Sequence, residues 1–349
     1  MQRRAALNQP TAVMVWNRNW PSLTQASSRS DRLTVKKLVA INPQAAREHG
    51  LEGQLGRWGE SFLAGREQEA AEALRIAGSL GDALSDLGGD QSLQSSVETI
   101  RKALDRRDRD ELLCLARAHQ DLREGSSFFQ RLAFERAAPR LRKAHEDLAR
   151  SGSIASLWAA MGLAGVDLYS ARYEQAARGF QELIRQTAME RYPALRGRAR
   201  WGLGMTRSRQ GLLAEALAQF QEAARHFSVA GETENLGAVG VRMAETFRFL
   251  GQDDAAWAHR HRALRGLLLY PSSRRLHDLL WESADAALEI GEPRVALVLQ
   301  DEGVGVAERS RDALILAEAL IRRSRVRLEA GQAQAARQDL NEASRQNRP

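Results

Sequence analysis

The chain has 349 residues, which exceeds a usual single domain and fits either two compact domains or one elongated array of repeats. Aromatic residues are scarce at 6% and there are only 8 prolines, while alanine, leucine, arginine and glutamate fill most segments, so an all-α fold is predicted. The formal charge of +7 suggests a nucleic-acid partner, but all but four of the 51 basic residues are arginines scattered among glutamates, and this distribution argues against one.

Residues 1–34 show no periodic apolar face and are rich in Ser, Arg and Asn, so this segment is predicted to be disordered or extended. Its short apolar run is broken by Asn17 and Asn19, and no stretch approaches the roughly 20 apolar residues that a membrane span needs. The one cysteine, Cys114, has helical apolar neighbours and is expected to be buried. Without an intrachain disulfide, the chain fits a reducing compartment, and we expect a cytoplasmic protein.

Residues 35–114 are predicted to form amino-terminal helical hairpins. The segment GRWGESFLAGREQEAAEALRIAGSL gives helix, turn and helix, with Gly65 at the turn. After it, SLGDALSDLGGDQSL resembles a connection because it is rich in Gly, Asp and Ser. A further pair is joined by a charged turn from Asp105 to Asp110.

A repeat array is predicted over residues 115–346. After one imperfect copy that starts near 115, five segments align without gaps at a spacing of 40 residues. Each begins at a position where a helix must end and turn back through a left-handed residue: Ala171, Gly211, Gly251, Gly291 and Gly331.

Small residues recur at two further offsets in the repeat. Five residues after the turn, where two helices are expected to cross closely, stand Ala176, Ala216, Ala256, Ala296 and Ala336. Seven before it stand Ala164, Gly204, Ala244, Ala284 and Ser324. Phe180, Phe220 and Leu340, nine after the turn, are expected to supply bulk, whereas Gln300 and Arg323 depart from the pattern and suggest looser packing in the last two repeats.

These columns, in this order, resemble the tetratricopeptide (TPR) pattern, although the period is 40 residues and not the usual 34. The resemblance implies an all-α fold, a right-handed α-α superhelix of TPR-like solenoid type. A HEAT-type solenoid is the alternative.

Residues 40–346 also resemble the helical repeat region that precedes CHAT domains, the caspase-like peptidase domains of bacterial proteins. The similarity is carried by WGESFLAGREQEAAEALRIAGSLGDAL, LARAHQDLREGSSFF and SIASLWAAMGLAGVDLYSARYEQAARGFQEL. In that family the catalytic histidine and cysteine lie in the later domain, so the resemblance implies a sensor or recruitment array.

No catalytic constellation is evident. None of the seven histidines pairs with another at the helical spacing that places two ligands on one metal. No G-x-S-x-G elbow occurs, and the glycine runs WGLGM and EGVGV fall at helix-crossing positions of the repeat. We therefore expect no enzyme activity, no metal and no cofactor.

TPR arrays usually bind through a groove lined by the first helix of each pair. Residues ten before the turn should point there, and that row reads Met161, Trp201, Val241, Trp281 and Ile321. Trp158 and Tyr169 share the face, and Arg198 and Arg209 flank Trp201, where they could contact a carboxylate. Tryptophans on such helices can also belong to the core between helices, so both placements stay open.

The sequence thus predicts a non-catalytic scaffold that binds a protein or peptide, coupled by resemblance to a CHAT-type peptidase system. Two alternatives remain, an arginine-rich regulator linked to nucleic acid and a gene fragment without independent function. The end at SRQNRP, directly after a second helix, favours truncation from a longer protein.

Overall fold

The computed structural model describes residues 12–188, 191–268 and 274–346. These residues form helices joined by short turns, with no strand among them. The prediction of an all-α fold is confirmed. The chain divides into two compact units, an amino-terminal unit of Val13–Glu232 and a carboxyl-terminal unit that contains Thr233–Pro349.

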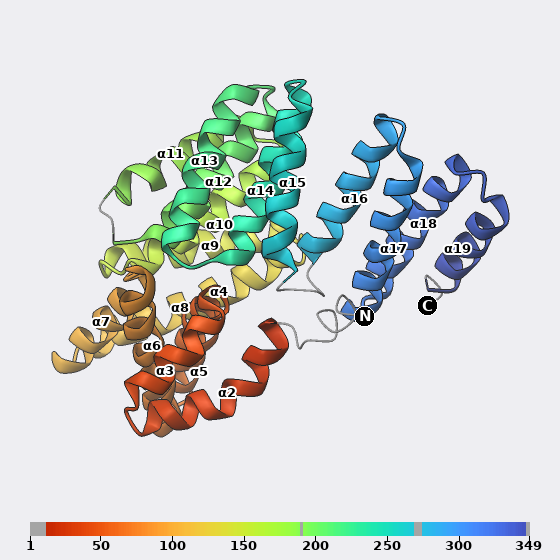
Figure 1. The fold of residues 1–349 in the computed structure, drawn as a ribbon. Coiled ribbons are helices and arrows are strands. Elements are labelled where there is room, and N and C mark those ends of the chain that lie inside the picture. Colours follow the sequence, from red (N-terminus) through yellow and green to blue (C-terminus); the bar gives the residue numbers. More distant parts are fainter. Residues whose placement is uncertain (1–11, 189–190, 269–273, 347–349) are drawn as a thin grey trace. The chain divides into compact units, whose positions relative to one another are not determined.

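From α5 onward, consecutive helices of the amino-terminal unit pack against one another, and Figure 1 shows α12 and α13 lying side by side. In chain order its helices are α2 (Ala12–Ser28), α3 (Arg32–Ile41), α4 (Pro43–Glu48), the π-helix η1 (His49–Gln54), α5 (Leu55–Leu63), α6 (Glu67–Gly88), α7 (Ser92–Asp105), α8 (Arg109–Gln130), α9 (Phe134–Arg150), α10 (Ala155–Tyr169), α11 (Tyr173–Gln186), α12 (Pro193–Arg209) and α13 (Leu213–Val229).

Two amino-terminal segments differ from what the sequence led us to expect. The segment 1–34, expected to be disordered or extended, forms α2 within its described part, because Leu23 and Ala26 at helical spacing are buried and Ser27 Oγ accepts a hydrogen bond from Arg75. Residues 1–11 lie outside the described residues. The expected connection at 79–93 is largely helical, since α6 continues to Gly88 and ends only at the left-handed Gly89.

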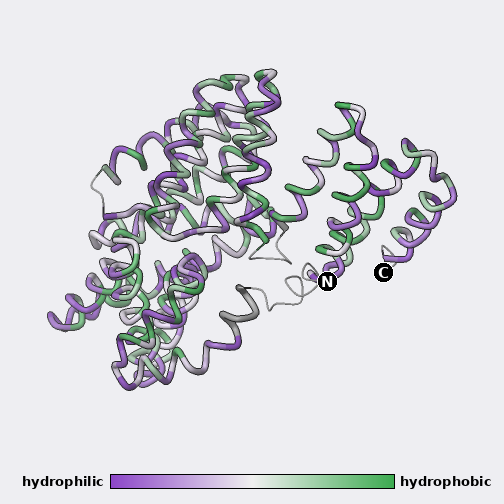
Figure 2. The backbone as a smooth tube through the Cα atoms, in the orientation of Figure 1, coloured by the Kyte–Doolittle hydropathy of each residue, from purple (hydrophilic) through white to green (hydrophobic). Residues whose placement is uncertain are grey.

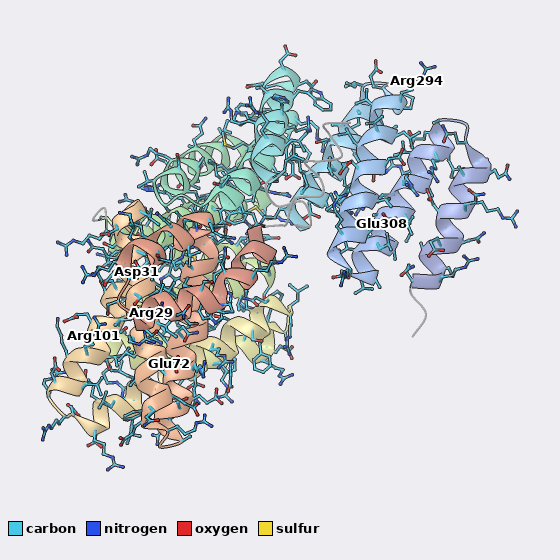
Figure 3. All side chains as sticks on the ribbon, turned by 60° about the horizontal axis from the view of Figure 1, so that its bottom comes forward. Arg29, Asp31, Glu72, Arg101, Arg294 and Glu308 are labelled. Atoms are coloured by element: carbon cyan, nitrogen blue, oxygen red, sulfur yellow. The ribbon has the colours of Figure 1, made fainter. Side chains whose placement is uncertain are left out.

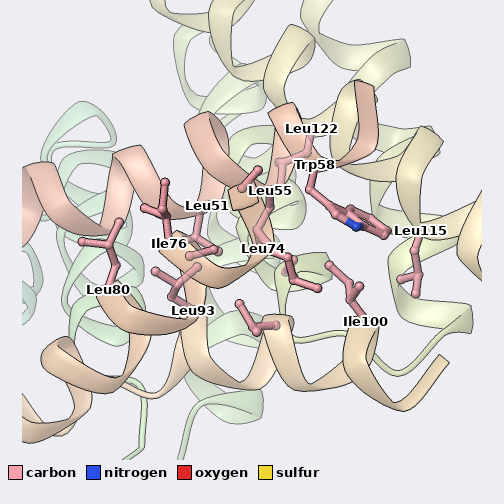
Figure 4. Packing of buried hydrophobic residues seen from close by; sticks show 14 of the residues in the cluster. Leu51, Leu55, Trp58, Leu74, Ile76, Leu80, Leu93, Ile100, Leu115 and Leu122 are labelled. Atoms are coloured by element: carbon pink, nitrogen blue, oxygen red, sulfur yellow. The ribbon is translucent and has the colours of Figure 1, made fainter. Parts of the chain in front are cut away.

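Hydrophobic residues of the amino-terminal unit gather between its helices. The close-up in Figure 4 shows Leu51, Leu55, Trp58 and Leu115 converging in one cluster, and all four are at most 3% exposed. In Figure 2 the backbone alternates between hydrophobic and hydrophilic stretches along individual helices, which is the pattern of helices that bury one face.

The described residues of the carboxyl-terminal unit form three helix pairs. Its helices are α14 (Thr233–Phe249), α15 (Asp253–Leu267), α16 (Arg274–Glu289), α17 (Pro293–Ser310), α18 (Ala313–Glu329) and α19 (Ala333–Gln346). Figure 3 shows charged side chains such as Arg294 and Glu308 projecting from the ribbon of this unit, and both residues are exposed.

The predicted register of the repeat is confirmed at its turns and crossings. All five turn residues have positive φ, from 58° at Ala171 to 79° at Gly291. The alanine column is at most 1% exposed throughout. At Gly204 a Cβ would lie 2.6 Å from the ring of Phe220, so a larger residue here would force that ring to move.

Nine residues after the turn, the expected bulky buried side chain is present in two repeats but not in the last one. Phe180 and Phe220 are buried, but Leu340 is 44% exposed. In the last pair the neighbouring Asp339 is buried in place of Leu340, at 3% exposure. Arg323 donates two hydrogen bonds to its carboxylate, at 3.0 and 2.7 Å. Ion pairs therefore fill the place that aromatic packing takes in the earlier repeats. Cys114, expected to be buried, is half-buried.

Candidate functional site

A pocket of about 280 Å³ lies within the amino-terminal unit. Helices distant in sequence line it. The acidic and basic side chains come from α4, η1 and α12, and most of the aromatic ones from α8 and α10. The lining residues are Arg47, Glu48, Leu51, Glu52, Leu122, Ser126, Phe129, Gln130, Leu141, Trp158, Met161, Gly162, Gly165, Leu168, Tyr169, Phe180, Arg198, Trp201, Gly202 and Met205.

The π-helix η1 places Glu52 at this pocket. A π-helical turn is uncommon and is found most often at functional sites. The helix η1 packs closely on α7 at Gly50. A Cβ at this position would lie only 2.2 Å from Leu93 Cδ2. Glu48, the last residue of α4, and Glu52 stand one helical turn apart and both line the pocket.

Two arginines that line the pocket form ion pairs with carboxylates. The Arg47 side chain is 1% exposed, forms an ion pair with Glu232, and has its Nη1 3.7 Å from Asp90 Oδ2. Arg198 Nη2 donates to Glu48 Oε1 at 2.8 Å across 150 residues of sequence. Because each guanidinium has an acidic partner, neither presents an uncompensated positive charge to the pocket.

Trp158 is a central side chain of the pocket. The guanidinium carbons of Arg47 and Arg198 lie 5.3 and 5.6 Å from the centre of its ring, within the range of cation–π attraction. Its Nε1 is buried and makes no hydrogen bond to the described residues. The ring also packs against two hydrophobic clusters of the unit, so Trp158 belongs to the core as well as to the pocket.

The two pocket glutamates differ in protonation behaviour. Burial opposes ionisation of Glu48, but Arg198 and Arg47 outweigh it and lower the pKa of this carboxyl group. Burial raises the pKa of Glu52 to about 7, and the negative charge of Glu48 adds to the rise, against the weaker opposing influence of Arg198 and a hydrogen bond with Ser126. Glu52 has no ion pair with any described residue.

Five of the nine groove residues expected from the sequence line this pocket. They are Trp158, Met161, Tyr169, Arg198 and Trp201. Tyr169 is 57% exposed and its ring stacks on Phe134 at 5.7 Å, while the ring of Trp201 meets that of Phe227 edge-on at 6.1 Å. Arg209, expected beside Trp201, is exposed and lies outside the pocket lining.

The other three expected residues belong to the carboxyl-terminal unit and do not form one row. Val241 is 3% exposed and packs in a hydrophobic cluster with Leu276, so it presents no surface to a ligand. Trp281 donates from Nε1 to Asp285 at 2.7 Å and is covered by Arg322, whose guanidinium carbon lies 3.1 Å from the ring centre. Ile321 is 50% exposed and lines a separate cavity of about 460 Å³ beside Arg322.

Sequence reasoning missed the α4–η1 contribution of Arg47, Glu48 and Glu52 to the pocket. These residues lie outside the 40-residue repeat, and the pairing of Glu48 with Arg198 joins segments that have no shared pattern. The local signal is limited to two glutamates at helical spacing in a glycine-containing stretch, REHGLEGQLG.

Among the described residues, no three His, Cys, Asp or Glu side chains are placed to hold a metal ion. No helix in the described part of the chain is long and apolar enough to cross a membrane.

No protein-family model matches the sequence, and no curated protein matches it. The structure does resemble solved structures. The apo form of the quorum sensor NprR from B. thuringiensis superimposes with a TM-score of 0.51 at 12% identity, over 86% of this chain and 76% of that chain. The Rap conjugation gene regulator of the plasmid pLS20, in complex with the Phr* peptide, gives 0.51 at 12% identity, over 85% of this chain and 94% of that one.

A third similar structure is a Signal Transduction ATPase with Numerous Domains from Pyrococcus horikoshii, which has a tetratricopeptide repeat sensor. Its TM-score is 0.52 at 13% identity, over 95% of this chain and 50% of that chain. At this level of identity the likeness shows the fold. The chain therefore has a TPR-like helical-repeat fold, as its sequence predicted.

Proposed function

We propose that this chain is a non-catalytic module that binds a peptide segment, and that the pocket of the amino-terminal unit receives part of that segment. The observation that carries the proposal is the pocket itself, which combines aromatic and aliphatic walls with a few polar groups, the usual composition of a ligand site. Its volume is close to the lower end of ligand pockets, about 300–1,000 Å³, which suits a few side chains of an extended peptide.

The similar structures support a peptide ligand. The plasmid pLS20 regulator is described as a complex with a peptide, and NprR is described as a quorum sensor. The pocket's chemistry also favours binding over catalysis, because Arg47, Arg198 and Glu48 are held in ion pairs and no histidine, cysteine or lysine lines it.

Binding of labelled heptapeptides from a positional-scanning library, followed by fluorescence polarisation, tests the proposal. Tyr169→Ala should weaken the selected peptides about tenfold, because truncating an aromatic side chain that anchors a ligand typically costs more than about 1 kcal/mol. Tyr169 is 57% exposed, so its removal should leave the fold intact. Ile321→Ala, which removes an exposed side chain of the carboxyl-terminal unit, is the control and should bind normally. The proposal fails if no peptide binds, or if only the Ile321 variant loses binding.

The coupling to a CHAT-type peptidase is the finer part of the proposal and rests on the sequence resemblance of residues 40–346. A cytoplasmic location rests likewise on the single cysteine. A neighbouring reading frame that encodes a caspase-like domain would support the coupling, and a genomic context without one would count against it.

The alternative of an arginine-rich nucleic-acid regulator is not favoured by the charge arrangement. Arginines of both units are paired with carboxylates, as in Arg198–Glu48 at 2.8 Å, Arg242–Glu282 at 2.7 Å and Arg323–Asp339 at 2.7 Å. Binding to DNA with a steep loss of affinity between about 50 and 200 mM salt would support the nucleic-acid alternative.

A further inference from the structure

The charges around the pocket do not balance. Arg47 is matched by Asp90 and Glu232, and Arg198 is matched by Glu48. This leaves Glu52, a half-buried carboxyl group that has no ion pair with any described residue. A carboxylate kept in a largely apolar pocket costs stability, since burial disfavours its charge and Glu48 repels it. A cationic ligand group would supply the missing partner.

The walls of the pocket suit a cation as well. Phe129, Trp158, Tyr169 and Trp201 line it, and ring faces attract ammonium and guanidinium groups. Leu122, Leu141 and Met161 offer apolar surface for the methylene stem of a long basic side chain. An acidic side chain would be repelled by Glu48 and Glu52. Arg47 and Arg198 could not offset this repulsion, because both are already paired with carboxylates.

We propose that the pocket receives an arginine or lysine side chain of the bound peptide, with Glu52 as the carboxylate that pairs with it. This inference rests on the proposed peptide-binding function and adds the chemical class of the anchoring residue. The occupant is one basic side chain of a peptide, identified by charge complementarity.

Binding should then depend on pH. Several charged and polar groups surround Glu52: Glu48 and Arg47 from α4, Arg198 from α12, Ser126 from α8, and His49 from η1 itself. Arg123 of α8 lines an adjoining cavity together with Glu52. A bound cation favours ionised Glu52, so binding releases a proton. Affinity for a basic peptide should therefore rise up to about tenfold from pH 6 to pH 8, the interval around a pKa of about 7.

The test uses the full chain and the same heptapeptide library, with Arg, Lys, norleucine or Glu at each scanned position. Wild type should prefer Arg or Lys at one position about tenfold over norleucine, with the affinity rising with pH as above. Glu52→Gln should abolish the preference and the pH slope, whereas Glu52→Asp should retain part of both. Glu222→Gln, which removes a partly exposed carboxylate of α13, is the matched control and should behave as wild type.

Loss of folding does not account for the expected result. Glu52→Gln removes a charge that burial disfavours, so its midpoint of thermal unfolding at pH 8 should equal or exceed that of wild type. If library peptides bind wild type with no preference for basic residues, or prefer Glu, this inference is overturned while the peptide-binding function stands. If no library peptide binds wild type, the proposed function itself is overturned.

Discussion

Replacing Arg47 by methionine is expected to lower the free energy of unfolding of the amino-terminal unit by about 3–5 kcal/mol. The Arg47 side chain is 1% exposed, and its partners Asp90 and Glu232 are 3% and 0% exposed. Without the guanidinium, two buried carboxyl groups lose the cation that contacts both of them. Burial already raises the pKa of Asp90, which shows how strongly this environment disfavours charge. Urea unfolding followed by circular dichroism measures the change.

Two further variants make the Arg47 result interpretable. Arg225→Met removes an arginine that is 62% exposed and pairs with Glu222 at 2.9 Å, and it should cost at most about 1 kcal/mol. The double variant Arg47→Met with Glu232→Met should recover part of the loss, because apolar groups replace both charges of one pair. A loss below about 1 kcal/mol for Arg47→Met alone would contradict the buried ion-pair account.

Replacing Asp339 by leucine is expected to destabilise the carboxyl-terminal unit by about 2–3 kcal/mol. This loss is smaller than that for a fully buried ion pair, because the arginine partners of Asp339 are partly exposed. Asp339 accepts from Arg323 at 2.7 and 3.0 Å, and Arg327 Nη1 lies 2.8 Å from it. The variant leaves both arginines with Asp301 as their acidic partner, and this carboxylate is 51% exposed. Thermal unfolding of the full chain should show an earlier transition.

The matched control for Asp339 is Asp301→Leu. Asp301 contacts the same two arginines but lies at the surface, so its loss should cost no more than about 1 kcal/mol. Equal effects of the two variants would mean that the buried position of Asp339 is not what stabilises the last helix pair.

The repeat could be predicted from the sequence because its constraints are local. A residue with positive φ at a fixed position, and an alanine five residues later, follow from the geometry of a tight helical hairpin and recur every 40 residues. At Leu340 the periodic pattern predicts the wrong burial. The periodic pattern assigns bulk to it, but Asp339 next to it is buried, because Arg323 on the facing helix supplies a partner that no local pattern reveals.

The candidate pocket could be predicted only in part. Met161 and Trp201 share a position in the repeat, and both line the pocket. Val241 has the same position but is buried, since the same face of a first helix meets different neighbours in different pairs. Glu52 could not be found from periodicity, because η1 lies outside the repeat and reaches the pocket only through the folding of the amino-terminal unit.

The location of the bound peptide tests the central claim most directly. A library peptide selected for binding, carrying benzophenone beside its basic residue, can be photo-cross-linked to the full chain and the attachment site mapped by mass spectrometry. The account predicts attachment to pocket residues of α10 or α12, such as Met161 or Met205. Attachment to α18 around Ile321, with none in the amino-terminal unit, would contradict it.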